Sequence, residues 1–260
     1  MEARAAPGGK SVDLSLVLAC YNEEPWLADS VREIVRVLDF SPLTYELILV
    51  DDASRDRTRD VIGGLAAAHP HTAIRTVFHE HNSGRGGAVA DGMRAATGGI
   101  VGFLDVDLEV HPRHIPACCL AIRQGAQVAV GARVFALVPR GLLRQFLSWG
   151  YAGLVHALLP AGGIRDTEAG CKFFRRDAIL PVLDLVRDRG WFWDTEIMIR
   201  CRLAGLVIAN VPCIYVRNPV KPSSVSLGRD IVESLWKLLA FRRELRRSGL
   251  LRGRRAPSPV

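Results

Sequence analysis

Short apolar runs alternate with stretches of helical hydrophobic spacing along the first half of the chain. Strands are predicted at residues 14–20, 45–50, 73–78 and 100–104. The first is a compact apolar run, and the continuous apolar run at 100–104 is typical of a strand buried on both faces. Between these runs, apolar residues recur at intervals of three and four, as in the stripe Val31, Ile34, Val35 and Leu38. This rhythm predicts an α/β fold with a mostly parallel, doubly wound sheet and flanking helices through about residue 131.

The second half is less regular but carries both kinds of pattern. Strands are predicted at 127–131 and 207–211, helices at 177–186 and 197–204, and an amphipathic helix at 142–159. We find no internal repeat and no linker rich in Gly or Pro. A single domain is therefore predicted at 12–226, preceded by a flexible N-terminus at 1–11 and followed by a helix and a basic tail at 227–260.

Polar side chains stand directly after four predicted strands. They are Glu23, Asp52, Arg85 and the pair Asp105 and Asp107. Because parallel strands point their carboxyl ends to one edge of a sheet, these loops should converge where open α/β sheets bind ligands. Paired carboxylates suit a hard divalent cation that is shared with substrate phosphates. The pattern predicts a cation and phosphate site at this edge.

Two further acidic pairs lie beside aromatic residues. Asp166 and Glu168 precede the aromatics at 173–174, and Asp194 and Glu196 follow those at 191–193. Carboxylates next to aromatic faces suit a sugar ring, and Asp166 or Asp194 could act as a general base if the acceptor were a hydroxyl. Helix capping and core packing explain the same residues equally well, so both interpretations stay open.

Some function classes fit poorly. The glycines at 84, 86 and 87 lack a third partner at Val89 and follow the third strand, which argues against a dinucleotide site. The six cysteines are scattered without a Cys-x-x-Cys pair, so we expect reduced, buried thiols rather than a zinc site.

The net charge of +7 is concentrated near the end of the chain. Residues 242–255 hold seven arginines and one acid, so the remainder is almost neutral. A solvated tail and a contact with anionic lipid are both open; no nucleic-acid module accompanies the tail. Without a signal peptide or a membrane-spanning run, we expect a cytoplasmic protein, with peripheral contact at the inner membrane face through the 141–160 helix and the tail.

Six ordered motifs together resemble the family 2 glycosyltransferases of the GT-A fold, in particular the dolichyl- or polyprenyl-phosphate mannose and glucose synthases. They are residues 18–23, 50–58, 84–88, the Asp-x-Asp segment 105–108, 131–133, and 166–174. The match covers residues 12–226. It departs from the family at Ala19 and Cys20, where Pro-Thr is usual, and many members carry C-terminal membrane spans. The signature of processive polysaccharide synthases, Gln-x-x-Arg-Trp, has no match at residues 145–149.

The resemblance implies roles for individual residues. Tyr21, Glu23 and Asp52 would hold the base and ribose of a UDP- or GDP-hexose, with Arg85 near the same nucleotide. Asp105 and Asp107, with Glu109, would hold Mg²⁺ or Mn²⁺ against the diphosphate. The candidates for binding the acceptor phosphate are Arg133, Arg217 and Lys221.

The expected activity is inverting, metal-dependent transfer of a hexose to a polyprenyl phosphate, with Asp107, Asp166 and Asp194 as the candidate catalytic residues. A soluble hydroxyl acceptor, in a metabolite or a sugar, is the first alternative. A nucleotide-sugar-binding protein without catalysis is the second.

Overall fold

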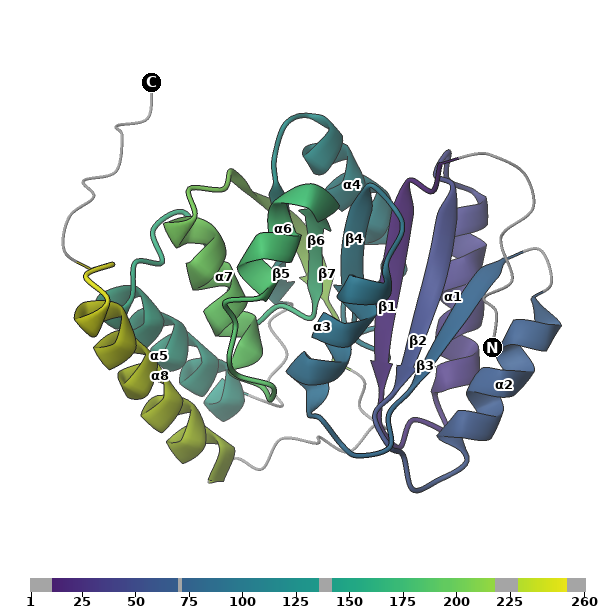
Figure 1. Cartoon of the computed structure of the whole chain (residues 1–260), viewed down its shortest axis with the longest axis horizontal. Helices are drawn as coiled ribbons and strands as arrows, with labels where there is room; N and C mark the ends of the chain where they lie inside the picture. The colour runs from purple at the N-terminus through teal and green to yellow at the C-terminus, as the bar shows by residue number, and fades with distance from the viewer. Residues whose placement is uncertain (1–10, 70–71, 136–141, 218–228, 252–260) are drawn as a thin grey trace.

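The sheet that positions the polar loops has seven strands, in the order β3-β2-β1-β4-β6-β5-β7 (Figure 1). The structure is a computed structural model that describes residues 11–69, 72–135, 142–217 and 229–251, except for the side chains of 135, 142–148 and 229–231. The strands are β1 (Leu14–Cys20), β2 (Tyr45–Asp51), β3 (Ala73–Phe78), β4 (Ile100–Leu104), β5 (Val128–Phe135), β6 (Cys171–Arg175) and β7 (Ile208–Tyr215). β6 runs antiparallel to β4 and β5, and the other pairings are parallel. The expected single α/β domain with a mostly parallel sheet is confirmed.

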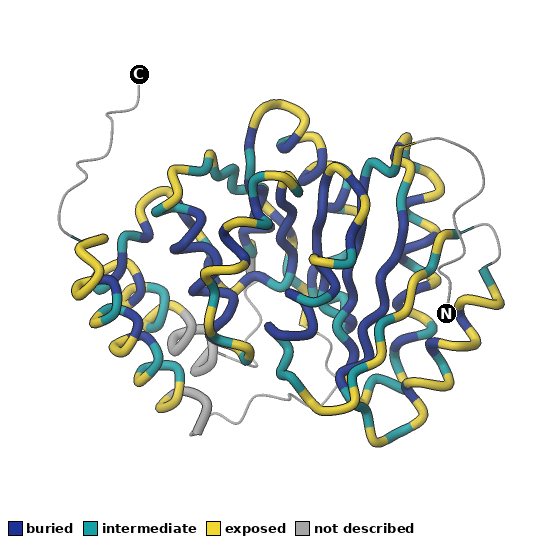
Figure 2. Tube along the Cα trace, in the orientation of Figure 1, coloured by how far each residue is buried: buried dark blue, intermediate teal, exposed yellow. Residues whose placement is uncertain are grey.

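Helices cover both faces of this sheet. One face packs against α1 (Leu27–Asp39), α2 (Thr58–Ala68) and α4 (Ile115–Arg123), the last preceded by a 3₁₀ turn at Pro112–His114. The other packs against α3 (Arg85–Ala95), α5 (Leu142–Leu158), α6 (Arg176–Leu183), α7 (Trp193–Leu203) and α8 (Arg229–Arg247). The dark strands between lighter helices in Figure 2 show the resulting three layers.

Strand alternation explains the two cores. In β1, Leu16 and Leu18 point toward α1, whereas Val17 points toward α3, and all three are fully buried. A strand buried on both faces needs apolar residues at every position, which is why it reads as a continuous run. Burial of each such side chain contributes about 1.5–3 kcal/mol.

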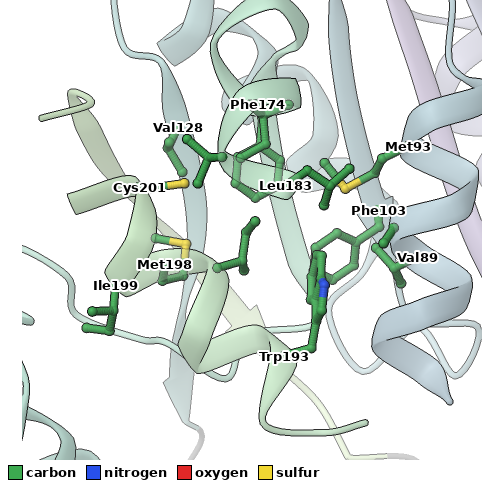
Figure 3. Packing of buried hydrophobic residues seen from close by; sticks show 14 of the residues in the cluster. Val89, Met93, Phe103, Val128, Phe174, Leu183, Trp193, Met198, Ile199 and Cys201 are labelled. Carbon is green, nitrogen blue, oxygen red and sulfur yellow. The ribbon is translucent and has the colours of Figure 1, made fainter. Parts of the chain in front are cut away.

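The core under the second face includes Phe103 and Trp193, which lie close together in Figure 3. Phe103, near the end of β4, and Trp193, at the start of α7, meet edge to face with ring centroids 5.7 Å apart. A Cβ at Gly86 would lie 2.3 Å from the Trp193 Cβ, so glycine is needed there for α3 to approach α7. This contact fixes the starts of α3 and α7 beside the end of β4.

Predicted and observed elements differ mainly in the second half. β5 and β7 continue to residues 135 and 215, beyond the predicted 131 and 211, because the two strands pair along eight residues despite polar positions such as Arg133. α7 begins at Trp193 rather than 197. β6 was not predicted, because it is short and contains Lys172 among its apolar residues.

α5 and α8 lie side by side on the outside of the second layer (Figure 1). They include the predicted amphipathic helix and the predicted C-terminal helix. Within the described ranges, no helix has the combination of length and apolar character required to cross a bilayer.

Candidate active site

The loops after β1 and β2 are joined to each other at the carboxyl edge of the sheet. Asn22 donates its backbone N–H to Ser54 Oγ at 3.0 Å and accepts from the Arg55 N–H at 2.8 Å. The backbone N–H of Glu23 donates to Thr58 Oγ1 at 2.7 Å. Tyr21 opens the first loop and is 41% exposed. The structure thus brings Tyr21 and Glu23 next to the β2 loop that contains Asp52.

Asp52 organises the loop that leads into α3. Its buried carboxylate accepts the Ser83 and Gly84 backbone N–H groups at 2.7 and 2.9 Å and the Ser83 hydroxyl at 2.8 Å, and it pairs with His79 Nδ1 at 2.7 Å. Gly84 has φ +84°, and a Cβ there would lie 2.4 Å from the Arg189 carbonyl oxygen. The hydrogen bonds accepted by Asp52 therefore fix the conformation of the glycine-rich turn that leads into α3.

The Asp-x-Asp segment forms a tight turn after β4. The Leu108 N–H donates to the Asp105 carbonyl at 3.1 Å, and Leu108 takes the left-handed backbone conformation with φ +51°. The Asp105 N–H donates to the Gly170 carbonyl at 3.0 Å, which ties this turn to the start of β6. The turn and the strands beside it form a small pocket, lined by Leu104, Asp105, Asp107, Glu109, Val110, Arg133, Glu168, Gly170 and Tyr215.

A row of alternating charges runs inward from this pocket. Arg85 donates to Asp105 Oδ1 from Nη2 at 2.6 Å and to Asp194 Oδ2 from Nη1 at 2.5 Å. Lys172, whose side chain is fully buried, donates to Asp194 Oδ1 at 2.6 Å and to the Ala169 carbonyl at 2.5 Å. Burial alone would lower the pKa of Arg85, but the charges of Asp105 and Asp194 outweigh burial and raise it. Arg85 therefore stays positively charged, and its hydrogen bonds hold the Asp105 carboxylate in one orientation.

A second ion pair involves Arg133, which also lines the pocket. Arg133, on β5, donates to the two oxygens of Asp166 from Nε and Nη2 at 2.6 and 2.9 Å. Burial favours the neutral form of Asp166, but the Arg133 charge and hydrogen bonds prevail and lower the pKa of Asp166 below its usual value. Arg133 also lies 3.6 Å from Glu168 and over the Tyr215 ring.

Glu109 is held at the rim of the pocket by β7. The Tyr215 hydroxyl donates to Glu109 Oε2, and the Val216 N–H donates to the Glu109 carbonyl at 2.8 Å. This contact raises the pKa of Tyr215, after the larger effect of its burial. Glu109 therefore carries a fixed carboxylate beside Asp107.

The acidic residues suit a hard divalent cation whose remaining coordination positions are filled by substrate oxygens. Asp105, Asp107 and Glu109 offer carboxylate oxygens around one pocket. Among the described residues, however, a set of three His, Cys, Asp or Glu donors within 4.8 Å of one another occurs only at three cysteines elsewhere. Mg²⁺ is commonly bound by one or two carboxylates plus water and phosphate oxygens, so these acids fit shared coordination better than an all-protein cage.

The basic residues predicted to bind the nucleotide and the acceptor phosphate lie in different surroundings. Arg85 points to Asp105 and Asp194 inside the fold, and Arg217 lies exposed just beyond β7. Lys221 lies outside the described residues. The sequence interpretation assigned no role to Tyr215 or Lys172. A lysine inside the apolar run at 171–174 is the signal that points to a buried carboxylate partner.

Comparison with known proteins follows this geometry. The family model described as Glycosyl transferase family 2 matches residues 15–181. Glycosyltransferase AglD of Haloferax volcanii is 32% identical over 96% of this chain, and the match spans 41% of AglD, less than half of that protein. The dolichyl-phosphate beta-glucosyltransferases of Trichomonas vaginalis and Drosophila melanogaster are 31% and 30% identical over 90% and 85% of this chain, and over 75% and 74% of their own lengths.

Solved structures share the fold. Glucosyl-3-phosphoglycerate synthase from Mycobacterium tuberculosis, in complex with Mn²⁺, UDP and glucosyl-3-phosphoglycerate, matches with a TM-score of 0.65 at 21% identity, covering 92% of this chain and 86% of that one. Its complex with Mg²⁺ and UDP matches with the same TM-score over 89% of this chain and 79% of that one. The expected GT-A fold is confirmed by these neighbours.

Proposed function

The chain belongs to glycosyl transferase family 2, and from this membership we propose that it transfers a hexose from a nucleoside-diphosphate sugar to a polyprenyl phosphate of the dolichyl type. The proposal includes inversion at the anomeric carbon and dependence on Mg²⁺ or Mn²⁺. Two of the relatives described above are dolichyl-phosphate glucosyltransferases, whose names state the acceptor. UDP with Mn²⁺ or Mg²⁺ is bound by structural neighbours.

On the donor side, we propose that Tyr21 and Glu23 contact the nucleoside, with Asp105 and Asp107 toward the diphosphate. The carboxylate of Asp52, also predicted as a nucleoside contact, is buried against Ser83, Gly84 and His79, so we propose that Asp52 acts by positioning the loop before α3. A divalent cation bound there would stabilise the negative charge that develops on the leaving diphosphate. Arg85 supports this arrangement by holding the Asp105 carboxylate in one orientation, with Nη2 2.6 Å from Oδ1. Glu109, restrained by Tyr215, completes the acidic rim.

The observation that supports a phosphate acceptor is that both candidate general bases, Asp166 and Asp194, are held in ion pairs. Asp166 is paired with Arg133, and its pKa is lowered. Both oxygens of Asp194 accept hydrogen bonds from cations. A general base for a hydroxyl acceptor works best with a pKa raised toward the working pH, whereas a phosphate acceptor attacks already ionised and needs only to be held. We therefore assign Asp166 and Asp194 to positioning Arg133 and Arg85.

We further propose that the acceptor phosphate meets Arg133, with Arg217 and Lys221 as additional contacts. Arg133 lines the same pocket as Asp105, where the diphosphate is proposed to lie. One oxygen of the acceptor phosphate would form a bond to the anomeric carbon as the bond to the diphosphate oxygen breaks. Attack from the face opposite the leaving group gives inversion.

A lipid acceptor calls for contact with a membrane surface, and α5 and α8 offer one. Their outer side chains include Trp149, Leu154, Trp236 and Leu239, exposed by 51%, 41%, 67% and 45%. Arg243, Arg246 and Arg247 follow on α8 and are exposed. Exposed tryptophans with neighbouring arginines are typical of helices that lie in the interface of an anionic membrane. We propose peripheral contact here, at the cytosolic face.

The decisive experiment is a transfer assay with the full chain. UDP- and GDP-hexoses are supplied with Mg²⁺ or Mn²⁺ and with either a polyprenyl phosphate or a soluble hydroxyl acceptor such as phosphoglycerate. We expect hexosyl transfer to the polyprenyl phosphate, dependent on the cation, with inverted anomeric configuration by NMR. Transfer only to the hydroxyl acceptor would overturn the lipid proposal, and donor binding without transfer to any acceptor would favour the non-catalytic alternative.

A further inference from the structure

Three cysteine sulfurs meet on the face of the sheet away from α3. Cys118 lies on α4, Cys171 begins β6, and Cys213 lies on β7. All three side chains are buried, with 0% exposure, and their sulfur atoms lie within 4.8 Å of one another. Three elements that are distant in sequence thus each place one thiol in the same cluster. The wide spacing of these cysteines in the sequence gives no indication of this cluster.

A glycine makes this convergence possible. β5 runs between β6 and β7, and Gly131 is the β5 residue beneath the sulfurs. A Cβ at Gly131 would lie 3.1 Å from both the Cys171 and the Cys213 sulfur. The missing side chain lets thiols from two strands that are not neighbours approach each other over β5, with Cys118 above them from α4.

The donor set and its dimensions suit a soft metal ion. Metal–thiolate bonds of about 2.3 Å place sulfurs on one ion about 4 Å apart, so the three sulfurs need only a small contraction to share it. Thiolate ligands favour Cu⁺ and Zn²⁺ over hard cations such as Mg²⁺. His114 Nε2 already accepts the N–H of Ile214, the residue after Cys213, at 3.2 Å. This nitrogen is therefore occupied, and the three sulfurs are the candidate ligands.

The cluster lies near one edge of the sheet, because β7 is the last strand in the sheet order. The three cysteine side chains are fully buried between β7, β6 and α4, so α4 and β7 must separate slightly to admit an ion.

From this geometry we propose that Cys118, Cys171 and Cys213 form a binding site for one soft, thiophilic metal ion, independent of the divalent cation proposed for catalysis. Each metal–sulfur bond replaces an S–H bond, and the proton is released to solvent. No electron transfer is involved, so the site works with reduced protein. The inference does not rest on the proposed transfer reaction.

The test is metal binding by the full reduced chain. Zn²⁺ is titrated in competition with a chromophoric chelator, Cu⁺ is titrated anaerobically, and Cd²⁺ is followed by its thiolate charge-transfer absorption. Native mass spectrometry counts the bound ions. We expect one ion per chain and no displacement by excess Mn²⁺ or Mg²⁺.

Matched variants assign the ligands. Cys118→Ala and Cys213→Ala should lower the affinity by more than the roughly 10–100-fold that loss of an outer-shell partner costs. Cys119→Ala, which removes a buried thiol from the adjacent position on α4, should bind as the unchanged chain does. If the cluster variants fail to fold, the unchanged chain and Cys119→Ala still decide the question by stoichiometry and absorption. Absence of the charge-transfer band, or binding that survives in Cys213→Ala, would overturn the proposal.

Discussion

The Lys172 ammonium and the Asp194 carboxylate form a buried ion pair, with Nζ 2.6 Å from Oδ1. The other oxygen of Asp194 accepts from Arg85, which also pairs with Asp105, so two acids balance two cations that have little contact with water. Removing one partner of a buried pair leaves an uncompensated charge, which costs far more than an exposed pair contributes.

Asp194→Asn should therefore destabilise the fold strongly. We expect the free energy of unfolding to fall by about 3–5 kcal/mol, because Lys172 loses its carboxylate partner and Arg85 keeps only Asp105. Urea unfolding followed by circular dichroism measures this change. Asp184→Asn is the control, since that side chain is 74% exposed and pairs with Arg94 only at 3.4 Å. A loss below 1 kcal/mol in Asp194→Asn would show that the ion pair is compensated in another way.

Asp107→Asn should reduce turnover by about 100-fold or more at saturating Mn²⁺, which is the scale expected when a group that stabilises developing charge is removed. The measurement is kcat for sugar transfer, combined with a Mn²⁺ titration of donor binding. Asp177→Asn, an acid 72% exposed at the start of α6, serves as the matched control. Turnover equal to that of the unchanged chain would remove Asp107 from the proposed cation site.

Gly170→Ala should disable the Asp105 position while leaving the fold in place. A Cβ at Gly170 would lie 1.8 Å from Asp105 Oδ2, so the carboxylate must turn away from Arg85 or β6 must shift. We expect kcat/KM to fall at least tenfold, which corresponds to about 1.4 kcal/mol in the transition state. Gly162→Ala meets no atom within 4 Å and should leave kcat/KM unchanged. Normal activity in Gly170→Ala would mean that Asp105 needs no fixed orientation.

Stability should decline in acid partly through Asp166. Its pKa is lowered in the folded protein by Arg133, so it stabilises the native state above about pH 4, where the unfolded carboxyl is ionised. That contribution is lost as the pH falls through the lower pKa of the native state. Urea unfolding between pH 7 and about pH 3 should show a smaller acid-dependent loss for Asp166→Asn than for the unchanged chain. Equal pH slopes for the two proteins would contradict this assignment.

Trp236→Ser should weaken binding to anionic vesicles if α8 lies on the membrane surface. Trp236 is 67% exposed, and loss of a buried indole at the interface should lower the partition coefficient about tenfold or more. Co-sedimentation with vesicles of anionic and neutral lipid measures this effect. Phe40→Ser is the control, because Phe40 is 90% exposed after α1, away from α5 and α8. Equal losses in both variants would argue against a specific docking face.

The sequence was sufficient for the first half of the fold. β1, β3 and β4 appear at their predicted bounds. β1 and β4 are buried on both faces and therefore nearly continuous in apolar residues, whereas β3 is an edge strand whose side chains are largely exposed. β6 could not be predicted in the same way, since its lysine is compensated by Asp194 from α7, a contact that only tertiary structure creates. The convergence of the loops at one edge of the sheet could be predicted from the order of strands and helices. The ion-pair partners of individual charged residues could not.

Arg85 illustrates that limit at the site. Its place after a strand predicted a residue near the ligand, and its two carboxylate partners are 20 and 109 residues away in sequence. Tyr215 likewise reaches Glu109 only because β7 extends beyond its predicted end. Pairings of this kind depend on side-chain reach across strands, which hydrophobic patterning does not encode.

The row Asp105, Arg85, Asp194 and Lys172 has alternating charges that cancel before any ligand arrives. A divalent cation approaching Asp105 therefore meets a carboxylate whose charge is already largely balanced by Arg85. The cation alone should bind weakly, and the diphosphate of the donor should supply the missing negative charge. Cation and donor are thus expected to bind synergistically, each raising the affinity of the other by the same factor.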